Sequence, residues 1–89
     1  MRAVITVIGK DTTGIIAQVS DVLWQKGVNI VDITQSVLDD LFVMVMLTDI
    51  SKSSVSLSEL SGQITGLGEK LGLKIHMMHE DVFNSMHRI

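Results

Sequence analysis

The chain of 89 residues contains no cysteine, and this absence alone excludes several kinds of chemistry. Without thiols the protein can form no disulfide bond, bind no metal through thiolates and use no cysteine as a nucleophile. The chain also lacks any apolar stretch long enough to span a bilayer, and Thr6 and Gly9 interrupt the first apolar run too early for a signal peptide. We therefore expect a cytoplasmic protein with no membrane partner.

Aromatic residues and positive charge are also scarce. The chain has two Phe, one Trp and no Tyr, and its ten acidic side chains outnumber seven Lys and Arg, which gives a net charge of −3. The basic residues are dispersed along the chain rather than gathered in one segment. Binding to a nucleic-acid backbone needs concentrated positive charge, and base stacking needs aromatic rings. We therefore expect no nucleic-acid partner.

Hydrophobic residues are plentiful by contrast, at 46% of the chain, and they suffice for the core of one domain. We divide this single domain, residues 1–89, into a folded core at 1–79 and a tail at 80–89. A chain of this length keeps a small margin of stability and often gains from a partner subunit.

The first half of the chain alternates between strand and helix patterns. Runs rich in Val and Ile predict strands, and apolar residues spaced three and four apart predict a helix with one buried face. Glycine ends the first strand and the helix, while Asp39-Asp40 is a turn signal between two strands. The expected elements are a strand at 2–8, a helix that begins at Ile15 and stops at Gly27, and a hairpin of strands at 28–38 and 41–47.

The second half repeats this order after a polar loop at 48–54. Ser56 and Glu59 have the spacing of a capping box, and leucines and isoleucine follow with helical spacing. Gly62, Gly66 and Gly68 lie inside this helix and each weakens it by about 1 kcal/mol relative to alanine, so packing must hold it. The expected elements are a helix that Gly72 closes, a strand at 73–79 and a short helix in the tail, where Val82, Phe83, Met86 and Ile89 are expected to pack on this or a neighbouring subunit.

The resulting order is β-α-β-β-α-β, which predicts an α+β domain of the ferredoxin-like type. Right-handed crossovers place both helices on one face of its antiparallel sheet. Residues 41–47 are apolar on both faces, so this strand is expected in the interior of the sheet with both faces covered. A second copy of the chain is the cover that we expect for the helix-free face, or for an edge of the sheet, which predicts a homodimer or a higher homo-oligomer.

Catalytic and metal-binding constellations are difficult to assemble from these residues. His76, His79 and His87 could join Glu80 in a metal site, but residues three apart on a strand point to opposite faces. No nucleophile, general base or metal set can be assembled elsewhere. We therefore expect no enzyme activity, no catalytic residue, no bound metal and no cofactor.

The loop at residues 9–14 is the strongest candidate site. It joins a strand to a helix, so it places free backbone N–H groups and a helix N-terminus at one point, which suits a small anion. The same residues have a structural interpretation, in which Asp11, Thr12 or Thr13 caps the helix. Asn29 follows the helix-ending glycine and enters the next strand, where its amide needs hydrogen-bond partners.

These two segments resemble a known family. Residues 11–17, followed by Gly27 to Ile30 and Asp32, are similar to the D-x-x-G-i-[IL]-A … G-[IV]-N-I pattern of ACT domains, which are regulatory modules that sense amino acids. The order of elements matches as well, so the resemblance covers essentially the whole chain. More narrowly, the chain resembles free-standing ACT domains of bacteria and archaea that are related to the glycine cleavage system repressor.

The resemblance implies a ligand and the residues that would hold it. In ACT domains that bind amino acids, the loop of one subunit and the strand-start asparagine of another hold the ligand between them. An aspartate at position 11, in place of an amide, would favour the ammonium group. Serine-sensing members carry a polar side chain where this chain has Gly9, so serine is not carried over as the ligand. The implied ligand-binding residues are Gly9, Asp11, Thr12, Thr13, Gly14 and Asn29.

Two functions follow from this sequence. In the first, the chain is a regulatory module that binds an amino acid or a similar small molecule at a subunit interface and signals to a separate protein. In the second, the loop is only a helix cap, and the sheet or the tail docks on another protein without any small-molecule ligand.

Overall fold

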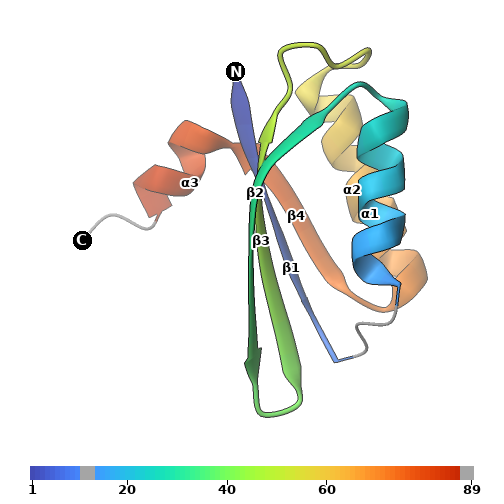
Figure 1. Cartoon of the computed structure of the whole chain (residues 1–89), viewed down its shortest axis with the longest axis vertical. Helices are drawn as coiled ribbons and strands as arrows, with labels where there is room; N and C mark the ends of the chain where they lie inside the picture. Colours follow the sequence, from blue (N-terminus) through green and yellow to red (C-terminus); the bar gives the residue numbers. More distant parts are fainter. Residues whose placement is uncertain (11–13, 87–89) are drawn as a thin grey trace.

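The computed structural model describes residues 1–10 and 14–86. Its elements follow in the predicted order, with a short helix after the last strand (Figure 1). This order confirms the ferredoxin-like α+β domain. The elements are β1 (Arg2–Gly9), α1 (Ile15–Gln25), β2 (Asn29–Leu38), β3 (Leu41–Asp49), α2 (Leu57–Leu71), β4 (Lys74–His79) and α3 (Glu80–Met86).

The four strands form one antiparallel sheet in the order β2-β3-β1-β4. The two central strands, β1 and β3, pair along their whole length from Arg2 opposite Asp49 to Gly9 opposite Phe42. Helices α1 and α2 lie side by side on one face of the sheet, as predicted, whereas α3 lies on the other side (Figure 1). The apolar strand β3 therefore lies in the interior of the sheet.

The core fills the layer between the sheet and the two long helices. Side chains alternate along a strand, so every second residue of β3 points toward the helices, and Phe42, Met44 and Met46 are buried there. Ile5 and Val7 of β1 lie beside them in the same core cluster. Each helix contributes buried residues of its predicted apolar face: Ile15, Val19 and Leu23 from α1 and Leu60 and Ile64 from α2. Gly68 of α2 is also buried, although it was not predicted to lie on that face.

Strand β3 is longer than predicted and carries a buried polar residue. Thr48, which the sequence suggested as the start of a loop, is fully buried near the end of this strand. Its hydroxyl donates a hydrogen bond of 2.9 Å to the carbonyl oxygen of Ala3 on β1. Because this bond satisfies the hydroxyl, threonine can occupy a core position at little cost.

The helix-free face of the sheet is only partly covered by the described residues. Val43, Val45 and Leu47 of β3 point to this face and are half-buried. Val4 of β1 also points there and is buried, at the end of the sheet where α3 contacts β1 and β4. Within one copy of the chain, the helices cover one face of β3. The second face, which was also expected to be covered, would need a further layer of protein.

The tail packs less than predicted. In α3, Val82 is 50% and Met86 65% exposed, so these two side chains pack little on their own subunit. Phe83 is half-buried, and an ion pair between Arg2 and Glu80 joins the start of α3 to β1. Ile89 lies outside the described residues. Packing of Val82 and Met86 on a neighbouring subunit stays a prediction.

The ends of the two long helices follow different rules. At the start of α2, the Ser56 hydroxyl accepts a hydrogen bond of 3.2 Å from the backbone N–H of Glu59, as the capping pattern predicts. At the start of α1, the N-cap residue is Gly14 itself, with a left-handed backbone and no side-chain cap. The residues of the predicted cap, Asp11, Thr12 and Thr13, lie outside the described part, so that interpretation stays a prediction.

The turn between α1 and β2 is held against the loop between β3 and α2. Ser54 in the loop donates a hydrogen bond of 2.8 Å to the carbonyl oxygen of Lys26 in the turn. Gly27 has a φ of 76°, and a Cβ atom there would lie 2.7 Å from the carbonyl oxygen of Lys52. Two backbone segments meet here more closely than a side chain would allow. We call these two segments the α1–β2 corner.

Substitution of Gly27 by alanine should therefore destabilise the protein through two effects. Gly72 provides the control, because it also has a positive φ but has open space where a Cβ would lie. We expect Gly72→Ala to lower the free energy of unfolding by about 1–2 kcal/mol through backbone strain alone. Gly27→Ala should lower it further, because the corner must also open. Urea denaturation of both variants measures the difference, and equal losses would contradict the close approach.

Alanine substitutions of two glycines inside α2 should change the free energy of unfolding in opposite directions, although the sequence suggested that each glycine weakens the helix equally. At Gly68 a Cβ would lie 2.8 Å from Cγ1 of Ile75, whereas Gly62 is exposed and has no atom within 4 Å of that position. We expect Gly68→Ala to destabilise the protein by about 1–3 kcal/mol through overpacking. Gly62→Ala should stabilise it by about 0.5–1 kcal/mol through helix propensity. Urea denaturation decides, and shifts of the same sign would show that α2 is not packed on β4 as described.

Candidate functional site

The residues predicted to bind a ligand lie at opposite ends of α1. Gly9 and Gly14 flank the segment that leads into the helix, and Asn29 is the first residue of β2 after the helix ends (Figure 1). A helix of 11 residues is about 16 Å long, so one chain does not bring these positions together. The predicted site residues Asp11, Thr12 and Thr13 lie outside the described residues.

The Gly9 end has a packing role as well as an open cavity. A Cβ at Gly9 would overlap the side chain of Leu73, so glycine makes room for that leucine. Gly9 and Lys10 line a cavity of about 430 Å³ whose other walls include Leu41 and Leu71. The walls of this cavity are largely apolar side chains, and the backbone at the start of the loop lies at its edge.

Gly14 begins α1 and leaves the first turn of the helix electrostatically unbalanced. Its carbonyl oxygen accepts a hydrogen bond of 3.0 Å from the backbone N–H of Gln18. The first turn carries no acidic side chain, and the first N–H groups of an α-helix have no partner within the helix. This end of α1 therefore has the property that the sequence suggested, a concentration of backbone donors that suits an anion.

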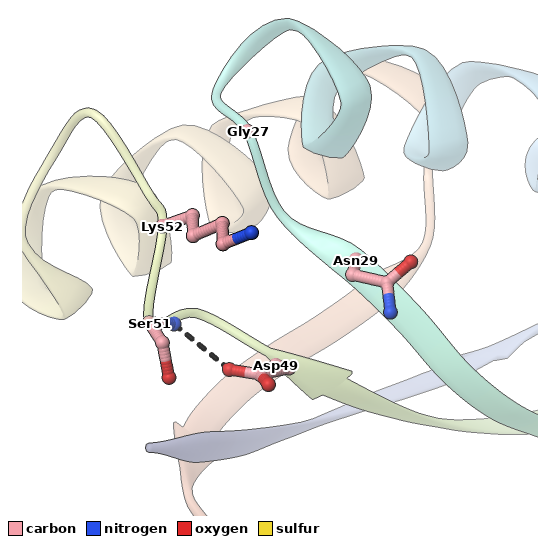
Figure 2. A pocket seen from close by; sticks show the side chains of 5 residues that line it. All are labelled: Gly27, Asn29, Asp49, Ser51 and Lys52. Atoms are coloured by element: carbon pink, nitrogen blue, oxygen red, sulfur yellow. Dashed lines mark hydrogen bonds between the residues drawn. The ribbon is translucent and has the colours of Figure 1, made fainter.

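The Asn29 end contains a polar cavity at the α1–β2 corner. The cavity has a volume of about 360 Å³, and Figure 2 shows the residues around it. In Figure 2, Lys52 extends from its loop toward the strand that carries Asn29, and the Asn29 amide points away from Lys52. Asp49, which is paired with Asn29 across the strands, lies below them in this view. The lining residues are Gly27, Asn29, Asp49, Ser51 and Lys52.

The Asp49 carboxylate is held in place and in its charged form. Its Oδ1 atom accepts a hydrogen bond of 2.9 Å from the backbone N–H of Ser51. Hydrogen bonds from the side chain and the backbone of Ser51 lower the pKa of Asp49 below its ordinary value, and the N-terminal ammonium and Arg2 act in the same direction. The N-terminal ammonium also donates a hydrogen bond of 2.8 Å to the Ser51 hydroxyl. Asp49 is therefore negative at neutral pH.

Two of the polar groups at this cavity are unused within the part of the chain that the structure describes. The Lys52 ammonium has no carboxylate within ion-pair distance there, and the side-chain amide of Asn29 has no hydrogen-bond partner. The cavity therefore presents a positive group, a negative group and an amide to a molecule that enters it. Sequence reasoning identified Asn29 but missed the other residues, because they lie in a segment whose only signal was its polarity.

The two described histidines, His76 and His79, do not form a metal site with the described acidic residues. Within residues 1–10 and 14–86, no group of three or more His, Asp or Glu side chains is arranged to hold a metal ion. The Nδ1 atom of His79 instead accepts a hydrogen bond of 3.0 Å from the backbone N–H of Asp81, and His87 is not among those residues.

None of the helices in residues 1–10 and 14–86 is both long and apolar enough to cross a membrane.

Comparison with known proteins agrees with this architecture. The family model described as "ACT domain" matches residues 2–78. UPF0237 protein MMP0657 of Methanococcus maripaludis is 52% identical over 88 residues, which cover 99% of this chain and 98% of that protein. UPF0237 protein lin0537 of Listeria innocua is 47% identical over the full length of both chains.

Solved structures lead to the same family. The ACT domain protein from Streptococcus pneumoniae is 37% identical and superimposes with a TM-score of 0.81 over 93% of both chains. A structure assigned to a glycine cleavage system transcriptional repressor is 27% identical, with a TM-score of 0.70 over 85% of this chain and 43% of the other. The match of the family model, the high identity to proteins of equal length and the shared fold together show that this chain belongs to the ACT domain family.

Proposed function

We propose that this chain is a small regulatory module that binds an amino acid, or a similar small molecule, at an interface between two copies of itself. One observation supports this most directly. The amide of Asn29 is exposed at the mouth of a polar cavity and has no hydrogen-bond partner among the described residues. An asparagine that only ends a helix needs no cavity beside its amide. An asparagine that binds a ligand does need one.

The interface would assemble the site from both ends of α1. The loop at residues 9–14 of one copy would supply backbone N–H groups to the ligand carboxylate, with Gly9, Asp11, Thr12, Thr13 and Gly14 on this side. Asn29 of the second copy would address the ammonium group together with Asp11 of the first. Since the two ends of α1 are separated within one chain, a single copy offers only half of this site. The signal would then pass to a separate regulated protein in the cytoplasm, and no catalytic step is part of the proposal.

The second copy has an apolar surface on which to dock. The helix-free face of β3 carries a row of half-buried aliphatic side chains, and the tip of the β2–β3 hairpin exposes Val37 and Leu38 by 72% and 71%. Surfaces of this kind are typical of interfaces between subunits. The same exposed surface also favours the alternative function, a protein–protein interaction module that binds no small molecule.

We expect the protein to be a homodimer or a higher oligomer at micromolar concentration, assembled through the helix-free face of the sheet. Val45→Asp would place a carboxylate in that interface, where an unpaired charge is costly, so this variant should dissociate. Gln63→Asp, on the exposed side of α2, is the matched control and should leave the assembly intact. Sedimentation velocity measures the mass of each. A parent chain that sediments as a stable monomer would contradict the proposed assembly.

Ligand binding should raise the melting temperature of the parent protein for at least one of the twenty amino acids, because a ligand stabilises the state that binds it. Asn29→Ala should weaken that binding by about 1.5–3 kcal/mol, the cost of a lost hydrogen bond to a charged group. Gly14→Val should abolish it by crowding the loop. Asn84→Ala, an exposed asparagine on α3, is the control and should bind as the parent does. Calorimetry measures the affinities.

The interaction-module alternative makes the opposite prediction for the same measurements. No amino acid would then change the melting temperature of the parent protein. Substitutions in the loop would alter stability alone, and Asn29→Ala would behave like Asn84→Ala. A flat response to all twenty amino acids would therefore leave the amino-acid-binding function without support.

A further inference from the structure

The cavity at the α1–β2 corner holds opposite charges that do not neutralise each other. Asp49 and Lys52 both line it, yet no ion pair joins them within 4.0 Å, and no other described acidic group pairs with Lys52. Exposed partners of opposite charge this close in sequence would ordinarily meet or turn away into solvent. Here the Lys52 side chain extends from its loop toward strand β2, at the end that carries Asn29 (Figure 2), and both residues line the cavity.

We propose that Asp49 and Lys52 bind the two charged ends of a free amino acid, on the same subunit that supplies Asn29. Asp49, together with the carbonyl oxygen of the Asn29 amide, accepts hydrogen bonds from the α-ammonium group. Lys52 donates to the α-carboxylate. This inference rests on the proposed function for the class of ligand, but it adds two recognition residues outside the predicted site, one at the end of β3 and one in the loop that follows it.

The charges of the cavity select a zwitterion over other small molecules. A simple anion such as phosphate would be attracted by Lys52 but repelled by Asp49, whose carboxylate stays ionised at neutral pH. A simple amine, which is positively charged, would be attracted by Asp49 but repelled by Lys52. Only a molecule with both charges gains from both side chains, and the Asn29 amide can serve either end because it has both donors and an acceptor.

The framework of the cavity is held before any ligand enters. The Ser51 N–H orients the Asp49 carboxylate, and the Ser54 hydrogen bond to Lys26 fixes the loop against the turn. The backbone of Lys52 lies against Gly27, where no Cβ intervenes. A second hydrogen bond, of 3.0 Å from Ile50 N–H to the Met1 carbonyl, ties the same loop to the start of β1. Because these groups are already ordered, little conformational entropy opposes binding.

The test combines charge-removing variants with ligands that lack one charge. Calorimetry first identifies which of the twenty amino acids binds the parent protein, and then uses its methyl ester, which has no carboxylate, and its N-acetyl derivative, which has no ammonium. We expect Lys52→Gln to weaken the amino acid about tenfold or more but to leave the methyl ester unchanged. Asp49→Asn should weaken the amino acid to a similar extent but leave the N-acetyl derivative unchanged.

The controls remove equivalent charges elsewhere. Lys70→Gln at the end of α2 and Asp21→Asn on α1 should bind the amino acid as the parent does, since neither residue lines the cavity. All four substitutions are at exposed or half-buried positions, and circular dichroism with thermal melting shows whether each variant folds. High salt should also reduce the effect of Lys52 and Asp49, because exposed charges are screened.

Each outcome supports or overturns the inference. If the amino acid binds, and Asn29→Ala weakens it while Lys52→Gln and Asp49→Asn do not, the two charges are not recognition residues and the proposed function stands without them. If Lys52→Gln weakens the methyl ester as much as the amino acid, or Asp49→Asn weakens the N-acetyl derivative as much as the amino acid, the effect is structural and the assignment is wrong. If no amino acid binds the parent protein, the inference and the proposed function both fail.

Discussion

The structure depends on one constraint, which is that two helices can cover only one face of a four-stranded sheet. Side chains on a strand alternate between faces, so β1 and β3 must each present half of their apolar residues away from α1 and α2. The helix side closes into a core of buried aliphatic side chains and methionines. On the other side, α3 lies against one end only, and the valines of β3 stay half-buried. The proposed need for a second copy follows directly from this asymmetry.

The candidate site depends on a second contact, in which two backbone segments approach each other at Gly27 and Lys52. This contact brings a loop from the middle of the chain beside the first residue of β2. It therefore gives Gly27 a role beyond ending a helix. The glycine of the G-V-N segment permits the corner, which brings Lys52 near Asn29, and the pairing of β2 with β3 places Asp49 opposite Asn29. All three residues then line one cavity. A family pattern that includes the glycine and the asparagine thus has a physical reason in this chain.

Local patterns predicted the elements well because they depend on neighbours in sequence. The spacing of Val19 and Leu23, the capping pair Ser56 and Glu59 and the helix-ending Gly72 all act within one or two turns, and each has the expected role. The mistakes occurred where distant segments decide. Thr48 reads as a loop residue until its hydroxyl meets the Ala3 carbonyl. Apolar and polar residues alternate irregularly after Asn29, and the pairing of β2 with β3 explains why. Val31 is the extra residue of a bulge between Ile30 and Asp32.

The sequence by itself determined the order of elements and the fold class, because hydrophobic periodicity and turn chemistry depend on residues that are close in sequence. Its resemblance to the ACT pattern indicated the family. Only the tertiary structure decided that Gly68 is a packing position and Gly62 is not, and that the N-cap position of α1 is Gly14. It also decided that Asp49 and Lys52 lie beside Asn29. These facts depend on contacts between segments that are distant in the sequence. The effect of a residue's charge and size therefore depends on which neighbours surround it in the folded chain.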